Sequence, residues 1–234
     1  MNATTREFLD LYSRLERAII DKYPVPEGIG PVAWLAKNER GFRSMRNELE
    51  YCREIRNFLQ HNELINGDYA VIPSEGMIDS LGETLSRVIS MPSAMSICVK
   101  AVDIYSAGID DCVRPAMKEM AIRVFTHIPI LDDGHVIGVF SENTLLSYMI
   151  SDEIVEIAED DTFEKVRELL PLDKHVSETF AFIGRDMVAT SIAELFQDAL
   201  KRNERLGMVF VTAHGKPSEK LLGIITSWDM AAFF

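Results

Sequence analysis

Long apolar runs are missing from this sequence of 234 residues, because no stretch reaches the roughly 18 apolar residues that a membrane-spanning helix needs. Cysteine is scarce, and Cys52, Cys98 and Cys112 are scattered without CxxC spacing, which predicts neither a disulfide framework nor a zinc site. The charged N-terminal stretch is unlike a signal peptide. We therefore expect a cytoplasmic protein with no metal and no membrane contact.

Several catalytic signatures are also absent. The sequence contains no glycine-rich phosphate loop, no HExxH and no G-x-S-x-G. His135, His175 and His214 fall in expected loops far apart along the chain, and we expect their side chains to be solvated. The enzyme classes that depend on these signatures are not indicated.

Positively charged residues are fewer than negatively charged ones, and the net charge is −13. Residues 1–92 hold 11 Lys and Arg against 14 Asp and Glu, so most of the negative excess lies in the remainder of the chain. An acidic body repels nucleic acid, so any contact with RNA is expected to be confined to a local patch. The best candidate for that patch is the basic stretch 37–56.

The first 92 residues show the periodicity of helices. Apolar residues recur there at spacings of three and four, and Pro24, Pro26 and Gly28 interrupt the pattern. Pro73-Ser74-Glu75 has the composition of a helix start. The expected helices cover 4–23, 31–38, 42–62 and a segment that begins near residue 75. They predict a small helical bundle over residues 1–92.

The rest of the chain contains two passages of similar order, 127–149 and 206–234. Each has a strand, a glycine-containing turn, a second strand, a small hydroxyl residue and a short helix, and each follows a longer helix. Two such copies are expected to pack as a pseudo-symmetric pair, because one copy alone leaves a sheet face uncovered. The sequence therefore predicts an α+β multidomain protein, with an N-terminal α-helical bundle followed by this pair.

The two passages align on their glycines. Placing Gly138 over Gly223 brings Ser141 over Thr226. The stretch 223-GIITSWD-229 then fits the pattern G-h-h-[ST]-x-x-D, where h is apolar. With this motif, residues 95–234 resemble a pair of cystathionine-β-synthase-type (CBS) domains, also called a Bateman module.

The resemblance implies two βαββα units, residues 93–150 and 151–234, whose clefts bind AMP, ADP, ATP or S-adenosylmethionine as a regulatory ligand. It also implies that Asp229 binds the ribose hydroxyls and Thr226 a phosphate oxygen. The residue chemistry agrees, because a carboxylate accepts two hydrogen bonds from a vicinal diol and a helix start favours an anion. The alternative is that Thr226 only caps a helix and Asp229 lies in its first turn.

The first copy departs from the motif. Its stretch 138-GVFSENT-144 ends in Thr144 where the motif has aspartate, so we expect one occupied cleft rather than two. Ser141 is the hydroxyl that matches Thr226. We expect His127 to pack at a strand start, with ligand contact as the alternative, and we take Arg185 as a candidate phosphate contact.

A second candidate site lies in the helical part, in 50-EYCREIRNFLQHNE-63. At about 100° per residue, Arg53, Asn57 and His61 share one helix face, and Arg56 adjoins it. A guanidinium grips phosphate and an imidazole exchanges a proton near neutral pH. These groups suffice for metal-free RNA cleavage, with His61 exchanging the proton and Arg56 stabilising the phosphorane.

The alternative for this stretch is a solvated helix face. Arg53 and Arg56 would then pair with Glu50 and Glu54, and His61 would only stabilise the helix C-terminus.

Arg56-Asn57-x3-His61, near the end of the third helix of a bundle, resembles the HEPN (higher eukaryotes and prokaryotes nucleotide-binding) family over about residues 1–92. Many HEPN proteins are metal-independent ribonucleases, usually dimers whose Arg and His line a shared cleft, and others serve only as binding modules. The resemblance implies a homodimer. It also implies Arg56, Asn57 and His61 as catalytic residues, supported by Arg53, where the domain is active.

These features predict a sensor in which the CBS pair binds an adenosyl ligand and controls a dimeric helical module that binds or cuts RNA. Two alternatives stay open. One is a metal-independent HEPN ribonuclease whose CBS pair is mainly a dimerisation platform, and the other is a non-catalytic interaction protein in which both halves only assemble. The residues do not decide whether the chain is an enzyme.

Overall fold

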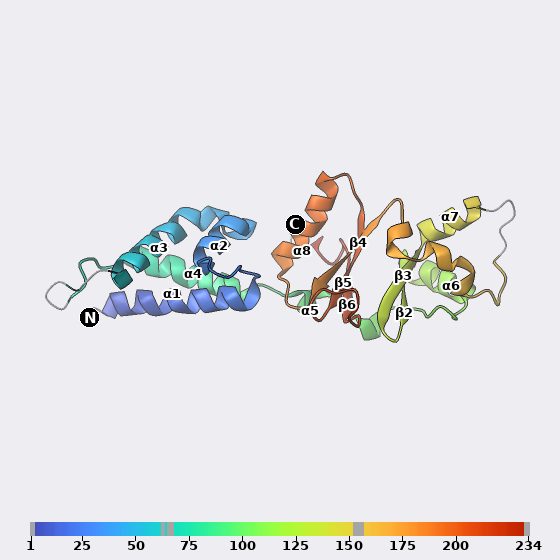
Figure 1. Cartoon of the computed structure of the whole chain (residues 1–234), viewed down its shortest axis with the longest axis horizontal. Coiled ribbons are helices and arrows are strands. Elements are labelled where there is room, and N and C mark those ends of the chain that lie inside the picture. The colour runs from blue at the N-terminus through green and yellow to red at the C-terminus, as the bar shows by residue number, and fades with distance from the viewer. Residues whose placement is uncertain (1–2, 62–63, 65–67, 152–156, 232–234) are drawn as a thin grey trace. The chain divides into compact units, whose positions relative to one another are not determined.

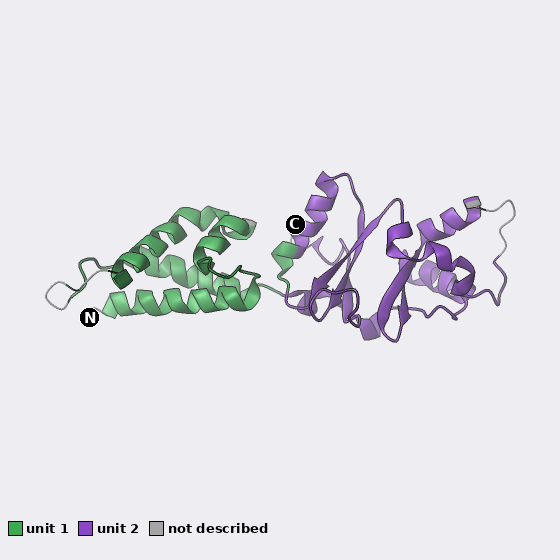
Figure 2. Ribbon diagram, in the orientation of Figure 1, with its two compact units in different colours: residues 1–92, 187–191 green, residues 93–186, 192–234 purple. Residues whose placement is uncertain are grey.

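The computed structural model describes residues 3–61, 64, 68–151 and 157–231. The chain divides into two compact units (Figure 2), one of residues 1–92 with 187–191 and the other of residues 93–186 with 192–234. Each unit buries apolar side chains in a core of its own.

The first unit is helical, as its periodicity predicts. The helices are α1 (Ala3–Lys22), α2 (Pro31–Asn38), the 3-10 helix η1 (Arg40–Met45), α3 (Arg46–His61) and α4 (Glu75–Ser90) (Figure 1). Each turns one apolar stripe inward: Phe8 and Leu15 of α1, Leu49 of α3 and Leu81 of α4 are fully buried in one cluster. Most of the stability of such helices comes from burying this stripe rather than from helix propensity.

Local chemistry fixes the helix ends in this unit. Pro31 opens α2, where its missing N–H costs no hydrogen bond. The hydroxyl of Ser74 accepts a hydrogen bond from the backbone N of Met77 and so caps the start of α4. The helix expected over 42–62 begins instead as the 3-10 turn η1, so its α-helical part starts at Arg46.

The second unit mixes strands and helices, which confirms the predicted α+β class. Its helices are α5 (Ala94–Ile97), α6 (Val113–Arg123), α7 (Glu142–Ser151) and α8 (Ala189–Lys201), with 3-10 turns η2 (Ala101–Asp103), η3 (Phe163–Leu169) and η4 (Leu172–Lys174). Its strands are β1 (Val99–Lys100), β2 (His127–Asp132), β3 (His135–Ser141), β4 (Thr179–Gly184), β5 (Leu206–Thr212) and β6 (Gly223–Ile225).

The strands form two sheets (Figure 1). One has the order β1-β6-β5-β4, with β4 parallel to β5 and the other pairs antiparallel. The other is the antiparallel hairpin of β2 and β3. Its turn contains Asp133 and Gly134, both with positive φ, as the Asp-Gly pair predicts.

Each copy of the repeat contributes a segment to the other copy's sheet or core. Val99 pairs with Ile224, so β1, which precedes the first copy, belongs to the four-stranded sheet of the second copy. Phe163 and Leu170, which follow the first hairpin, pack in the same cluster as Ile128. This exchange holds the ends of β3 and β6 in place, where the hydroxyl residues of the motif lie.

A short helix is predicted after Thr226. There, Ser227 to Met230 form turns and Ala231 is in a 3-10 helical conformation. The last three residues, 232–234, lie outside the described residues.

Candidate functional site

The two aligned glycines have the same packing role. A Cβ atom on Gly138 would lie 2.5 Å from the carbonyl oxygen of Leu170, and a Cβ atom on Gly223 would lie 2.5 Å from the carbonyl oxygen of Val99. In both copies a neighbouring backbone crosses directly against the strand, so no side chain fits. The glycine of the motif is therefore explained by packing, and it sets the position of the residues that follow.

Thr226 and Asp229 form a closed turn after β6. One carboxylate oxygen of Asp229, Oδ2, accepts hydrogen bonds from the backbone N of Thr226 at 2.7 Å and from its hydroxyl at 2.8 Å. The predicted capping relation is thus reversed, since the aspartate side chain caps the threonine. The turn holds a carboxylate and a hydroxyl side by side.

Thr226 lines a cavity of about 310 Å3, which we name the Thr226 cavity. Trp228 of the same turn also lines it, and so do Tyr105, Arg123, Phe125 and His127. The volume is at the lower end of the range for small-molecule sites. The motif turn and the residues around the start of β2 therefore meet at one cavity.

Flat aromatic surfaces and one cation dominate this cavity. The rings of Tyr105 and Phe125 stack with centroids 5.8 Å apart, and the guanidinium of Arg123 lies 5.7 Å from the centre of the Phe125 ring. The Trp228 side chain is 85% exposed. Aromatic faces of this kind stack on a nucleobase, and an arginine pairs with phosphate.

His127 lies at the start of β2, as expected, and its side chain is only 9% exposed. Its Nδ1 lies 2.7 Å from the hydroxyl oxygen of Thr126, and its Nε2 lies 2.7 Å from Oε2 of Glu178. His127 also lines the Thr226 cavity. Both interpretations of this residue, packing at a strand start and access to a ligand, are therefore compatible with its position.

Glu178 is a buried carboxylate that the sequence analysis missed. Its side chain is 0% exposed, and besides His127 it contacts the hydroxyl of Ser141 at 2.8 Å and Nδ1 of His175 at 3.3 Å. Burial opposes ionisation of Glu178, but the hydrogen bonds from His127 and His175 outweigh it and hold the pKa of this carboxyl well below its usual range. No periodicity or motif in the sequence marks Glu178.

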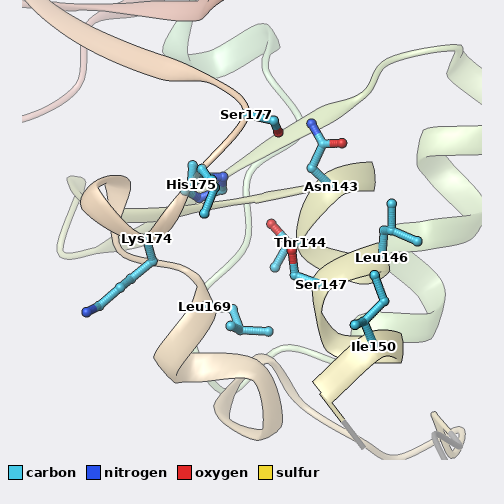
Figure 3. A pocket seen from close by; sticks show the side chains of 10 residues that line it. Asn143, Thr144, Leu146, Ser147, Ile150, Leu169, Lys174, His175 and Ser177 are labelled. Atoms are coloured by element: carbon cyan, nitrogen blue, oxygen red, sulfur yellow. The ribbon is translucent and has the colours of Figure 1, made fainter.

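The expectation that His175 is solvated is wrong, because its side chain is 2% exposed and contacts Glu178. His214, by contrast, is largely exposed. His175 lines a second cavity of about 240 Å3, which we name the His175 cavity (Figure 3). Asn143, Thr144 and Ser147 of α7 also line this cavity. A single sequence cannot separate a loop histidine in solvent from one folded back onto a carboxylate.

The first copy repeats the turn of the second without its charge. The hydroxyl of Thr144 accepts a hydrogen bond from the backbone N of Ser141 at 3.0 Å, as Asp229 does from Thr226. Ser141 is buried, and its hydroxyl donates to Glu178. The hydroxyls of Ser141 and Thr226 thus both donate to a protein carboxylate, and the two residues differ in that Ser141 is buried.

Arg185 lies just after β4 with its side chain 53% exposed. Its Nε atom lies 3.9 Å from the carboxylate of Asp186. The arginine that lines the Thr226 cavity is Arg123, so the role of Arg185 as a phosphate contact stays a prediction.

The helical candidates all lie on α3, which ends at His61. Arg53 pairs with Glu50, as the solvated-face alternative expects. Arg56 instead reaches Glu16 of α1 at 3.4 Å, and it donates to the side-chain oxygen of Asn57 at 3.1 Å. His61 is exposed at the end of the helix. One chain therefore brings Arg56 to Asn57, and Arg56 is also held by an interhelical ion pair.

Across the described part of the chain, no group of three or more His, Cys, Asp or Glu side chains is arranged to hold a metal ion. In the same ranges, no helix combines the length and the apolar character needed to cross a membrane.

No protein-family model and no curated protein matches the chain, whereas solved structures do. A Vibrio cholerae protein described as an acetoin utilization protein (AcuB) is 19% identical with a TM-score of 0.45, over 61% of this chain and 89% of its own. CBSX2 in complex with AMP is 16% identical with a TM-score of 0.42, over 60% and 93%. The CBS domain pair of protein MJ0100, in complex with 5′-methylthioadenosine and S-adenosyl-L-methionine, is 16% identical with a TM-score of 0.42, over 62% and 96%.

CBS domain pairs are thus structural neighbours of about 60% of the chain. The HEPN-like interpretation of residues 1–92 rests on the sequence motif alone.

Proposed function

We propose that the second unit is a regulatory module that binds one adenosyl compound in the Thr226 cavity. The observation that carries this proposal is the turn in which Asp229 holds the backbone N and the hydroxyl of Thr226, at the edge of a cavity with aromatic walls. The turn supplies a hydroxyl and an anchored carboxylate, and the walls supply stacking surfaces. Ribose, phosphate and adenine need these three kinds of contact.

Each group has a specific role in this proposal. The carboxylate of Asp229 accepts hydrogen bonds from the ribose hydroxyls, and the hydroxyl of Thr226 turns from Asp229 to donate to a phosphate or carboxylate oxygen of the ligand. Arg123 supplies the positive charge at the cavity wall. Trp228 and Tyr105 provide faces for the adenine ring. In the first copy the matching residue, Ser141, is buried, which supports one ligand per chain rather than two.

Regulation follows if ligand binding favours one arrangement of the two units in a homodimer. A ligand shifts such an equilibrium only as far as its affinity differs between the two arrangements. The helical unit would then be the part that responds, by binding RNA or a protein.

Titration calorimetry with AMP, ADP, ATP and S-adenosylmethionine tests the binding step. We expect saturable binding of at least one compound with one site per chain, and loss of binding in Asp229→Ala. Arg202→Ala is the matched control, because Arg202 is exposed after α8, pairs with Glu204 and does not line the cavity. Absence of binding at millimolar concentration of every compound, or equal binding by Asp229→Ala, would overturn the proposal.

A metal-independent ribonuclease is the second candidate. The observation that favours it is that α3 continues unbroken to His61, which keeps Arg53, Asn57 and His61 on one face, with Arg56 bonded to Asn57. A productive cleft requires Arg56 and His61 from a second copy. In this alternative the CBS pair is mainly a dimerisation platform.

Incubation of the purified protein with total RNA in EDTA tests the ribonuclease. Cleavage that disappears in His61→Ala and persists in His135→Ala supports it, and intact RNA rules it out. A protein that neither binds an adenosyl compound nor cleaves RNA fits the third function, a non-catalytic interaction protein.

A further inference from the structure

The buried carboxylate of Glu178 joins the walls of the two cavities. Its Oε2 lies 2.7 Å from Nε2 of His127, which lines the Thr226 cavity. Its Oε1 lies 3.3 Å from Nδ1 of His175, which lines the His175 cavity. Ser141 donates a further hydrogen bond to Oε1. A change of charge at either histidine therefore changes the electrostatic potential at the carboxylate and at the other cavity.

The contacts of the two histidines differ in the number of protons they require. His127 faces the Thr126 hydroxyl on one side and Glu178 on the other, and a neutral ring satisfies both: Nδ1 accepts from the hydroxyl and Nε2–H donates. His175 faces two acceptors, Oε1 of Glu178 and the carbonyl oxygen of Leu170, each at 3.3 Å. An imidazole donates from both nitrogens only when it is doubly protonated.

The resulting cluster is charge-neutral, with one carboxylate and one imidazolium. A buried carboxylate without a compensating charge is costly, so this protonation state is also favoured by electrostatics. The pKa of the Glu178 carboxyl, lowered by its hydrogen-bond donors despite burial, agrees with an ionised glutamate.

The remaining surroundings supply no competing charge in contact with the cluster within the described residues. The hydroxyls of Ser141 and Thr144 face it from β3 and α7, and Phe180 of β4 presents its ring with a centroid 5.0 Å from that of His175. Gly207 of β5 has no side chain there, and a Cβ atom would lie 3.3 Å from Oε2 of Glu178.

Four charged side chains lie nearby. Lys174 lines the His175 cavity, but its ammonium end points away from His175 (Figure 3). Glu142, at the start of α7, is exposed. Asp103 and Arg123, of opposite charge, line the Thr226 cavity with His127. The groups that hydrogen-bond to the carboxylate of Glu178 are Ser141 and the two histidines, so the histidines are the titratable groups that balance it.

We propose that the His127–Glu178–His175 cluster is a proton-linked connection between the two cavities, in which His175 is an imidazolium at neutral pH and the loss of its proton weakens the binding of anionic ligands in the Thr226 cavity. The second part rests on the proposed function of that cavity. When His175 is neutral, the negative charge of Glu178 behind His127 is no longer balanced. A ligand phosphate in the Thr226 cavity then meets a more negative wall and binds less tightly.

The charge state of His175 is tested without ligand. In the full chain labelled with 15N-histidine, long-range 1H–15N spectra at about pH 7.5 distinguish an imidazolium from a neutral ring. The five histidines are assigned by single replacements with Gln. We expect an imidazolium pattern for His175, a neutral ring with bare Nδ1 for His127, and conversion of His175 to the neutral form in Glu178→Gln. A neutral His175 in the unaltered protein overturns the proposal.

The link to binding is tested with AMP and adenosine at about pH 7.5 and 9, where more than about 95% of the AMP phosphate is doubly ionised. We expect the affinity for AMP to fall several-fold at the higher pH, the affinity for adenosine to change little, and the difference to disappear in His175→Gln. His135→Gln is the control, because His135 lies in the hairpin and its Nδ1 faces the backbone carbonyl of Asp132 at 3.2 Å.

The outcomes separate the two proposals. If AMP and adenosine do not bind at all, the proposed function falls, while the spectra still decide the charge state of His175. If AMP binds with the same dependence on pH in the unaltered protein and in His175→Gln, the connection is overturned and the binding function stands.

Discussion

Asp229 holds Thr226 through a single carboxylate oxygen, at 2.7 Å from the backbone N and 2.8 Å from the hydroxyl. In the other copy of the repeat, Thr144 makes the equivalent bond to the backbone N of Ser141 at 3.0 Å. The two turns therefore have the same local bond and differ in charge. This difference makes it possible to separate the structural role of Asp229 from a role in binding.

Asp229→Thr gives the second turn the uncharged hydroxyl that Thr144 supplies in the first turn. The threonine hydroxyl can keep the bond to the backbone N of Thr226, so we expect the free energy of unfolding to change by less than about 1 kcal/mol. Affinity for AMP should fall by about tenfold or more, because hydrogen bonds to a charged group contribute roughly 1.5–3 kcal/mol. Calorimetry and urea unfolding measure the two effects.

Asp229→Ala is the companion variant, since it removes both the charge and the turn bond. It should lose affinity and also some stability. If Asp229→Thr binds AMP as tightly as the unaltered protein does, the carboxylate has only a capping role.

Trp228 provides a direct optical signal, because its side chain is exposed and lines the Thr226 cavity. The other tryptophan, Trp34, packs against Tyr23 in the helical unit with ring centroids 5.9 Å apart. In a Trp34→Phe background, we expect AMP to quench the remaining fluorescence as the adenine ring stacks on the indole. Trp228→Ala should weaken binding by about 1–3 kcal/mol.

Ribose 5-phosphate is the control ligand for this signal, because it lacks the base. Quenching by ribose 5-phosphate equal to that by AMP would contradict stacking. So would a quenching curve whose midpoint differs from the dissociation constant measured by calorimetry.

Gly138→Ala should destabilise the second unit. The new Cβ atom would lie 2.5 Å from the carbonyl oxygen of Leu170, and only a backbone shift can relieve that contact. We expect a loss of about 1–3 kcal/mol in urea unfolding. The matched control is Gly82→Ala in the interior of α4, where no heavy atom lies within 4 Å of the new Cβ atom. This control should gain roughly 0.5–1 kcal/mol, because alanine favours a helix over glycine. Equal effects of the two changes would refute the packing role of Gly138.

Arg56→Ala should destabilise the helical unit by about 1 kcal/mol, because Arg56 pairs with Glu16 of α1 and its guanidinium lies 5.4 Å from the centre of the Tyr12 ring. Arg53→Ala should cost only a few tenths of a kcal/mol, since Arg53 pairs within its own helix with Glu50. Thermal unfolding of both variants measures the difference. If RNA cleavage is found, this loss of stability must be subtracted before Arg56 is assigned a catalytic role.

Periodicity and turn chemistry were enough to predict most of the fold. The helix expected over 31–38 is α2, and the pair Asp133-Gly134 forms the turn between β2 and β3. These features depend on neighbours along the chain. The pairing of Val99 with Ile224 was not predicted, because it joins residues more than a hundred positions apart and depends on which sheet has a free edge.

The candidate site was also predicted in part. The alignment of Ser141 with Thr226 and of Thr144 with Asp229 corresponds to real turns, because each lies within one short segment. Glu178 and the burial of His175 were missed, because the other partners of Glu178 are His127 of β2 and Ser141 of β3, which lie 51 and 37 positions away. Spacing along the sequence does not show which distant segments come into contact, unless the same spacing occurs a second time in the chain.

Glu178 also makes a prediction for acid stability. Burial opposes its ionisation, but its hydrogen-bond donors lower the pKa of the folded carboxyl below that of the unfolded chain, which is about 4.3. A carboxyl with a depressed folded pKa contributes stability that is fully present above the unfolded pKa and is lost as the pH falls through the folded pKa. The advantage of the unaltered protein over Glu178→Gln should therefore shrink as the pH falls below about 4.

Urea unfolding at several pH values measures how the stability of the second unit depends on pH. The fluorescence of Trp228 in the Trp34→Phe background follows the unfolding. Glu164→Gln is the control, because Glu164 forms an exposed pair with Arg167 and such pairs contribute about 0–1 kcal/mol. A difference between the unaltered protein and Glu178→Gln that stays constant as the pH falls below about 4 would mean that Glu178 is protonated in the folded state. The hydrogen bonds of His127 at 2.7 Å and Ser141 at 2.8 Å would then be made to a neutral carboxyl group.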